Sequence, residues 1–227
     1  MAKCLFVAGT ATDVGKTFIS AQIVKCLKNS NLNAGYYKAA ASGVELDDKG
    51  NLIDGDPIYV NKTADIGEQP ENLVSYIYKE AVSPHLAAKI NNKPIDFNVI
   101  RRDFTHAYNK YDYLVVEGSG GVVCPLRFDD SEKIMLLDIV TAFNLPIVLV
   151  ADAGLGTINA VVLTVDYLQW RNFNIKGIIL NHFRDELMER DNLFMIETLT
   201  NIPVVAKVKR DDTLLNMNVD DLIKMFD

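Results

Sequence analysis

The amino-acid sequence predicts an α/β fold: a doubly wound, mostly parallel sheet with helices on both faces. Short apolar runs alternate along the chain with longer segments in which apolar residues recur at helical spacing. The runs are almost continuously apolar, which is typical of strands that helices cover on both faces. Alternation of such strands with helices indicates a parallel sheet that binds its ligands beyond the carboxyl ends of the strands.

Six apolar runs are the candidate strands, at residues 4–9, 34–39, 113–118, 146–152, 175–181 and 203–208. Residues 15–29 and 157–170 each carry a stripe of apolar side chains at helical spacing and are predicted to be helices. The polar, glycine- and aspartate-rich segment 42–57 is expected to be a surface loop, and the tail beyond Lys209 to hold one short helix.

The bulk composition limits the classes of protein to which the chain can belong. A length of 227 residues suits one α/β domain spanning residues 1–227, and a formal net charge of -7 argues against a nucleic-acid surface. The opening apolar run is too short for a signal peptide, and no stretch approaches the roughly 20 apolar residues of a membrane span. Cys4, Cys26 and Cys124 are odd in number and widely spaced, so we expect buried thiols in the reducing cytoplasm.

The turn after the first run, GTATDVGKT, differs by one position from the usual phosphate-binding P-loop, G-x-x-x-x-G-K-[ST]. That pattern requires glycine where this chain has Thr10, and the glycine stands one residue earlier, at Gly9. A strand still leads into the turn and a helix follows at once, so backbone N–H groups and the helix N-terminus point at an anion. We therefore predict a P-loop in which Lys16 contacts the β- and γ-phosphates and Thr17 binds Mg²⁺. The alternative, an ordinary turn that contains GKT by chance, is less well supported by the sequence.

Two carboxylates are candidates for holding that metal. Glu117 ends the apolar run 113–118 and is expected at the same rim as the phosphate loop. Gly118, Gly120 and Gly121 follow it and allow close approach of a ligand to the backbone. The alternative is a solvated glutamate at a strand end. Asp56 shares its polar segment with three other aspartates, and composition alone does not separate it from a solvated turn residue.

Lys38 closes the second apolar run, and two interpretations of it stay open at this point. We expect the second strand to neighbour the first in the sheet, which would place Lys38 near the phosphates. The alternative is an edge lysine whose stem covers apolar surface while its ammonium group reaches water. Ser42, four residues further on, is a weak signal by itself.

Together these segments resemble the dethiobiotin synthetase family. Its phosphate loop reads G-T-x-T-x-V-G-K-T, and residues 9–17 match it in register, so the early glycine is the family's own variant. Further matches are YYKAAASG at 36–43, SPHLAA at 83–88, VVEGSGG at 115–121 and GLGTIN at 154–159. The resemblance covers about residues 4–181.

The resemblance implies a carbon–nitrogen-forming cyclo-ligase of biotin biosynthesis that uses 7,8-diaminononanoate, CO₂ or bicarbonate, and ATP. One amine captures CO₂ as a carbamate, the carbamate attacks the γ-phosphate of ATP, and the second amine closes the ring and expels phosphate. The products are dethiobiotin, ADP and phosphate. Such chemistry requires cations around the developing phosphoryl charge and close alignment of the carbamate with the γ-phosphate.

The resemblance also implies a role for each matching residue. Lys16 and Lys38 would neutralise the phosphoryl and carbamate oxygens, and Thr17, Asp56 and Glu117 would hold Mg²⁺. Thr12 and Ser42 would hydrogen-bond the reacting groups. The residues implied to bind ATP are Asp13, Val14, Gly15, Lys16, Thr17, Phe18, Asp56, Glu117, Gly118, Ser119, Gly120 and Asn181. Those implied to bind the diamine are Thr12, Lys38, Ser42 and Gly121, with Leu155, Gly156, Thr157, Ile158 and Asn159 of a second subunit meeting its carboxylate. A homodimer with its active sites at the interface follows from this.

The chain departs from the family pattern at three positions. Ala39 replaces the proline after the lysine of the second strand, a change expected to be harmless. Ala206 and Lys209 replace the glycine and proline of the family's last-strand turn, although Asn181 stands where the family reads the purine edge. We therefore expect a weaker preference for adenine than is usual in the family.

Three other classes of protein fit the sequence less well. A partitioning or Min-type switch ATPase would carry a second lysine between Gly9 and Lys16 and a basic membrane-binding tail, whereas this tail is acidic. A glutamine-dependent amidase would need an appended glutaminase domain, for which we expect no room in 227 residues. A small-molecule kinase would carry an arginine-rich lid, and segment 42–57 contains no arginine.

Overall fold

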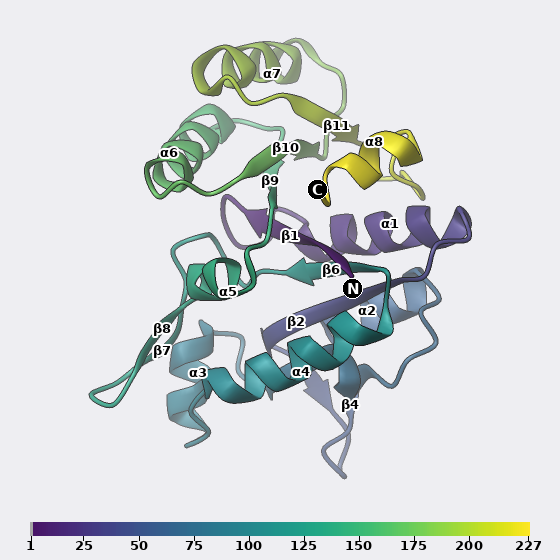
Figure 1. The fold of residues 1–227 in the computed structure, drawn as a ribbon. Coiled ribbons are helices and arrows are strands. Elements are labelled where there is room, and N and C mark those ends of the chain that lie inside the picture. The colour runs from purple at the N-terminus through teal and green to yellow at the C-terminus, as the bar shows by residue number, and fades with distance from the viewer. Residues whose placement is uncertain (1) are drawn as a thin grey trace.

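The computed structural model describes residues 2–227, which fold around a seven-stranded parallel sheet (Figure 1). The order across the sheet is β11-β10-β9-β1-β6-β2-β5. The strands are β1 (Lys3–Gly9), β2 (Ala34–Ser42), β5 (Val74–Tyr78), β6 (Tyr113–Glu117), β9 (Ile147–Asp152), β10 (Ile175–Asn181) and β11 (Val204–Val208). Six of them lie where the sequence predicts strands, and the expected fold class is confirmed.

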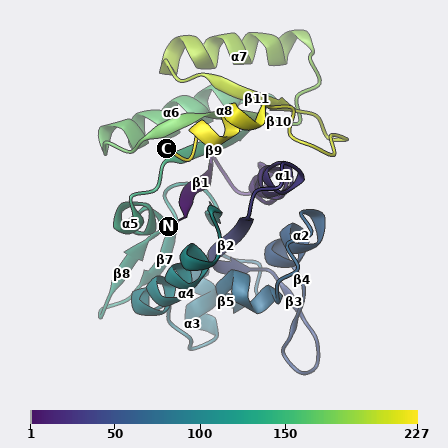
Figure 2. The same cartoon turned by 45° about the vertical axis from the view of Figure 1, so that its right-hand side comes forward.

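Helices cover both faces of the sheet, as expected for a doubly wound fold (Figure 2). One face packs against α1 (Lys16–Asn29), α2 (Asp56–Thr63) and α8 (Val219–Lys224). The other packs against α3 (Pro84–Ile90), α4 (Phe97–Lys110), α5 (Leu136–Phe143), α6 (Thr157–Trp170) and α7 (Leu187–Thr200). Alternate residues of each central strand enter the two cores: Leu5 and Val7 of β1 face α1, whereas Cys4 and Phe6 face the opposite layer. The start and the end of the chain lie together, since Lys3 Nζ is 2.5 Å from Asp227 Oδ1.

The prediction of neighbouring first and second strands was wrong. β6 lies between β1 and β2 and pairs in parallel with both, so that Val7 and Lys38 are both register partners of Glu117. A seventh strand was also missed: β5 occupies the sheet edge beside β2. Its sequence VSYIY alternates buried and half-buried residues, which is the pattern of an edge strand and not of a continuous apolar run.

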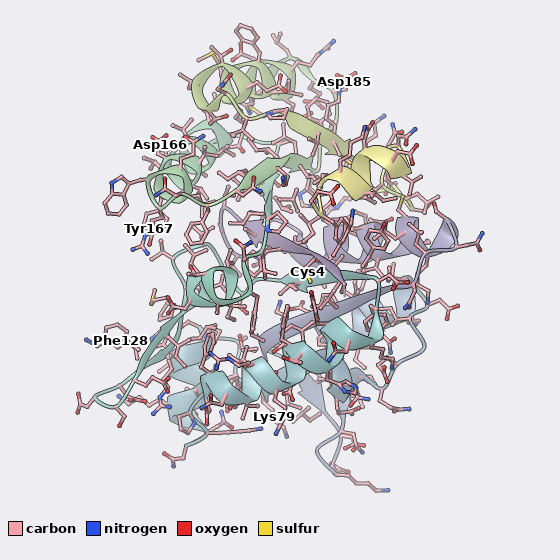
Figure 3. All side chains as sticks on the ribbon, viewed as in Figure 1. Cys4, Lys79, Phe128, Asp166, Tyr167 and Asp185 are labelled. Atoms are coloured by element: carbon pink, nitrogen blue, oxygen red, sulfur yellow. The ribbon has the colours of Figure 1, made fainter. Side chains whose placement is uncertain are left out.

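Segment 42–57 was expected to be a loop, and this was wrong in part. It contains a small hairpin, β3 (Glu45–Leu46) and β4 (Leu52–Asp54), and it ends in the first turn of α2. The hairpin is anchored because Leu52 and Val44 pack into a small apolar cluster with Ala41 and Val74. The remaining elements are the helical turn η1 (Pro70–Leu73) and a second hairpin, β7 (Pro125–Phe128) with β8 (Lys133–Met135), from which Phe128 projects (Figure 3).

All three cysteines are free. Cys4 and Cys124 are buried as expected, and burial raises the pKa of the Cys124 thiol to about 11. Cys26 is only half-buried, because it lies at the margin of the packed face of α1, so the expectation of burial was wrong there.

Across residues 2–227, no helix has the length and apolar character that crossing a membrane requires.

Candidate active site

The phosphate loop joins the end of β1 to the start of α1, and its first glycine has a steric reason. Lys16, the first residue of α1, is buried and folds back over the loop, where its Nζ donates to the carbonyl oxygen of Ala11 at 2.9 Å. A Cβ atom at Gly9 would lie 2.9 Å from Cδ of Lys16 and 3.0 Å from its Nζ. Gly9 therefore leaves room for the lysine stem, and Gly15, at φ 94°, turns the chain into the helix.

Three oxygen-bearing side chains converge just beyond this loop. Thr17 Oγ1 lies 2.8 Å from Asp56 Oδ1 and 2.9 Å from Glu117 Oε1. A hydroxyl has one proton, so Thr17 donates to one of these carboxylates at a time. Asp56 arrives as the first residue of α2 and Glu117 as the last residue of β6. A hydroxyl with two carboxylates, all hard oxygen donors around one point, suits a magnesium ion that keeps several waters.

Lys38 closes this cluster from the neighbouring strand. Its side chain is only 5% exposed, and its Nζ lies 2.5 Å from Asp56 Oδ2 and 2.6 Å from Glu117 Oε1. Burial by itself would lower the pKa of Lys38, but the two carboxylates outweigh burial and raise that pKa above its usual value. Burial lowers the pKa of Lys16, and the positive charge of Lys38 lowers it further. The two lysines are therefore close enough in one site for their charges to interact.

A buried tyrosine, which sequence reasoning did not single out, completes the contacts of Glu117. Tyr36 Oη donates to Glu117 Oε2 at 3.0 Å, whereas Thr17 contacts the other oxygen of the carboxylate. Burial, followed by the negative charge of Glu117, raises the pKa of Tyr36 well above its usual value, so the phenol stays a donor. The signal in the sequence is positional: Tyr36 stands two residues before Lys38 and thus on the same face of β2.

These residues line a pocket of about 640 Å³. Of the predicted site residues, it includes Thr12, Asp13, Gly15, Lys16, Thr17, Phe18, Lys38, Ser42, Asp56, Glu117, Ser119 and Gly120. It also takes in four that the sequence did not indicate, namely Ala40, Asp54, Gly55 and Tyr59. The lining does not include the predicted site residues Val14, Gly118 and Gly121. A Cβ atom at Gly121 would come within 3.3 Å of the carbonyl oxygen of Thr10, so the two loops pack backbone to backbone.

Asn181, at the end of β10, packs against the far side of the phosphate loop. Its Nδ2 donates to the carbonyl oxygen of Val14 at 3.0 Å, while its buried Oδ1 has no partner among residues 2–227. The neighbouring His182 places Nδ1 at 2.7 Å from Asp152 Oδ2, another pair that sequence reasoning missed. The sequence predicted that Asn181 binds the nucleotide, but Asn181 does not line the pocket, and its unpaired Oδ1 has no exposed surface. An acceptor left unpaired in this way is costly.

The segment 155–159 does not line the same pocket. Leu155 is 94% exposed, and Thr157 begins α6 with a buried hydroxyl that has no partner among the described residues. The structure therefore gathers the phosphate-loop, Lys38, Asp56 and Glu117 positions in one pocket and leaves residues 155–159 on a separate surface of the same chain.

The chain is similar in sequence to several known proteins. A family model described as an AAA domain matches residues 3–218. A protein of Brachyspira hyodysenteriae named ATP-dependent dethiobiotin synthetase BioD is 43% identical over 228 residues, covering 100% of both chains. A protein of the same name from Clostridium botulinum is 48% identical over 205 residues, covering 90% of this chain and 89% of that protein.

Solved structures share the fold at low sequence identity. The MinC:MinD cell division complex of Aquifex aeolicus is similar with a TM-score of 0.56 at 13% identity, over 99% of this chain and 86% of that one. The signal recognition particle receptor FtsY of Elizabethkingia anophelis has a TM-score of 0.53 at 12% identity, over 98% of this chain and 64% of that one. At these identities the likeness concerns the fold alone.

Proposed function

This chain belongs to the family of ATP-dependent dethiobiotin synthetases, and we propose that the pocket around Lys16, Lys38 and Glu117 is where it closes the ring. Family membership makes it a cyclo-ligase of biotin biosynthesis. The observation that carries the site is convergence: two lysines, two carboxylates and a threonine from distant parts of the chain meet at one phosphate loop.

Thr17, Asp56 and Glu117 would hold magnesium. The support is the donor set, because an oxygen of Asp56 and an oxygen of Glu117 both lie within hydrogen-bond distance of the Thr17 hydroxyl beside the phosphate loop. Among residues 2–227, no group of three His, Cys, Asp or Glu side chains is placed to hold a metal, so the other ligands of the ion would be water and phosphate oxygens. Magnesium would offset the negative charge that develops between the β- and γ-phosphates.

Lys16 and Lys38 would act as fixed cations on either side of the transferred phosphoryl group. The raised pKa of Lys38 keeps its ammonium group charged at neutral pH, so it stabilises anionic oxygens and does not remove a proton. Both side chains are held before substrate arrives, Lys16 by Ala11 and Lys38 by Asp56 and Glu117. Such preorganisation lowers the barrier because little rearrangement accompanies the transfer.

The diamine end of the substrate would lie between Thr12, Ser42 and the backbone at Gly121. Thr12 and Ser42 line the pocket, and Ser119 Oγ donates to the carbonyl oxygen of Ala40 at 2.8 Å, which ties the glycine loop to β2. This would hold the carbamate in line with the γ-phosphate. In-line placement is the main requirement of phosphoryl transfer.

The carboxylate tail of the diamine would be met by residues 155–159 of a second subunit, in a homodimer. The N-terminus of the 14-residue α6 offers backbone donors to an anion, and the buried hydroxyl of Thr157 beside it has no partner among the described residues. Three large apolar residues on α6 and the turn before it are exposed: Leu155 is 94%, Leu163 61% and Trp170 77% exposed. Leu163 and Trp170 are seven residues apart and share one face of α6, which suits a buried interface.

We also infer one domain over residues 1–227 and a cytoplasmic location. The central sheet takes strands from near both ends of the chain, β1 and β11, and the termini are joined by Lys3 and Asp227. The free cysteines fit a reducing compartment.

A phosphate-release assay tests the function. Release from ATP and Mg²⁺ is measured with both 7,8-diaminononanoate and bicarbonate, with each alone, and with neither. We expect release only when both are present, together with dethiobiotin detected by mass spectrometry. A rate of phosphate release that is the same with and without the two substrates would indicate a switch ATPase and contradict the proposal.

A further inference from the structure

Tyr36 is a fully buried side chain that reaches the active site from the core. It lies on β2 two residues before Lys38 and directly across from Val115 of β6, while Lys38 lies across from Glu117. Tyr36 and Lys38 therefore share one face of the strand. On the next strand, Glu117 lies directly across from Lys38 and diagonally across from Tyr36. The ring of Tyr36 packs in the apolar cluster beneath α1.

The two oxygens of Glu117 have separate partners. Oε1 faces the site, where it contacts Thr17 and Lys38 at 2.9 and 2.6 Å. Oε2 faces the core, where Tyr36 Oη donates to it at 3.0 Å. Among residues 2–227, Glu117 is the only hydrogen-bond partner of the Tyr36 hydroxyl. With no exposed surface on the carboxylate, rotation about its last bond would cost the Oε2 contact.

We propose that Tyr36 is a positioning residue for the magnesium site: by holding Oε2 of Glu117 it keeps Oε1 turned toward Thr17 and the metal. This rests on the proposed role of Glu117 as a metal ligand. Hydrogen-bond partners of ligating carboxylates fix their orientation, and their loss costs about 10- to 100-fold in metal affinity or activity.

The chain supplies a matched control in the adjacent residue. Tyr37 is also fully buried, but it faces the opposite core, where its hydroxyl pairs with Ser75 Oγ at 2.7 Å and with the carbonyl oxygen of Ile100 at 3.2 Å. Tyr36→Phe and Tyr37→Phe each remove one buried hydroxyl and leave the ring in place. Only Tyr36→Phe frees Glu117.

The test measures the dissociation constant of ATP by calorimetry, without diamine, in EDTA and in saturating Mg²⁺. The ratio of the two constants reports how much the metal contributes to nucleotide binding. We expect this ratio to fall about tenfold in Tyr36→Phe and to stay at the wild-type value in Tyr37→Phe. We also expect the ligase activity lost by Tyr36→Phe to return as Mg²⁺ is raised, with the wild-type melting temperature retained in EDTA.

Each other outcome is decisive. An unchanged ratio in Tyr36→Phe, or an equal fall in both variants, overturns the positioning role. Failure of Tyr36→Phe to fold in EDTA, while Tyr37→Phe folds, shows that the contact supports the core and overturns it as well. A wild-type protein with no Mg²⁺ effect on ATP binding contradicts the metal site itself, which separates that failure from one of Tyr36.

Discussion

Lys38 shows how a single buried charge can organise a site. An ammonium group with 5% of its side chain exposed is tolerated because Asp56 and Glu117 both contact it. The sequence could not decide between an edge lysine and a site lysine, since the two preceding tyrosines and the predicted strand end fit either. The prediction of a strand end at Lys38 was itself wrong, because β2 continues to Ser42. The deciding fact is that Glu117 lies across from it on β6, and pairing between distant strands is not encoded locally.

Replacing Lys38 by methionine keeps the stem and removes the charge. We expect ring closure to fall at least about 100-fold, because a fixed cation beside the transferred phosphoryl group is lost. Glu117, whose side chain is fully buried, loses its cationic partner, so the free energy of unfolding in EDTA should fall by about 3–5 kcal/mol. Added Mg²⁺ should restore part of this stability without restoring activity. Lys25→Met is the control, because Lys25 does not line the pocket and its Nζ donates to the carbonyl oxygen of Thr213 at 3.2 Å. A Lys38→Met protein with full activity would contradict the role.

Ala206 and Lys209 bear on recognition of the nucleotide base. Asn181 offers an unpaired acceptor beside the phosphate loop, but the family's last-strand turn is replaced at Ala206 and Lys209. We expect GTP and CTP to compete measurably with ATP when all three are supplied at equal concentration and product nucleotides are quantified. A strong preference for ATP would refute this expectation.

At the scale of elements, the phosphate loop and strand β6 were predictable from short-range patterns. An apolar run ending in Glu117 indicated the strand end, and a glycine-rich turn followed by a helical stripe indicated Lys16 and Thr17. The predicted adjacency of the first and second strands was wrong, and the predicted loop at residues 42–57 was wrong in part. Both depend on packing between segments far apart in the chain, such as Val44 and Leu52 against Val74. Tyr36 was missed because a buried tyrosine in a strand is usually a core residue.

Gly9 links the loop variant to the position of Lys16. A Cβ atom there would come within 2.9 Å of the lysine stem and 3.0 Å of the carbonyl oxygen of Ala11, so Gly9→Ala must displace one of them. We expect KM for ATP to rise about tenfold or more, as phosphate contacts are lost, with secondary structure retained by circular dichroism.

Gly50→Ala is the control for backbone strain. It has φ 83° but nothing within 4 Å of the new Cβ, so it should cost about 1–2 kcal/mol of stability without changing KM for ATP. Equal values of KM in Gly9→Ala and in the wild type would contradict the steric account.

At the scale of the whole molecule, the proposed homodimer would complete each active site with residues 155–159 of the second subunit. Lys38→Met is defective in the pocket, and Asn159→Asp places a carboxylate in the first turn of α6, where it should repel the diamine's own carboxylate. Mixed in equal amounts and allowed to exchange, half of the dimers carry one of each, with one intact site. We therefore expect about a quarter of wild-type activity when each variant alone is inactive. No recovery after confirmed exchange would place residues 155–159 with the pocket of their own chain.

Thr17 and Lys38 both contact Glu117, which follows them along the chain by 100 and 79 residues respectively. A growing polypeptide therefore has no working centre until β6 has emerged from the ribosome and entered between β1 and β2. Contacts of such long sequence separation form late and slowly. The rate at which a fluorescent ATP analogue binds during refolding would thus report the rate at which this one strand enters the sheet. Nucleotide binding by the protein itself can therefore be used to follow its folding.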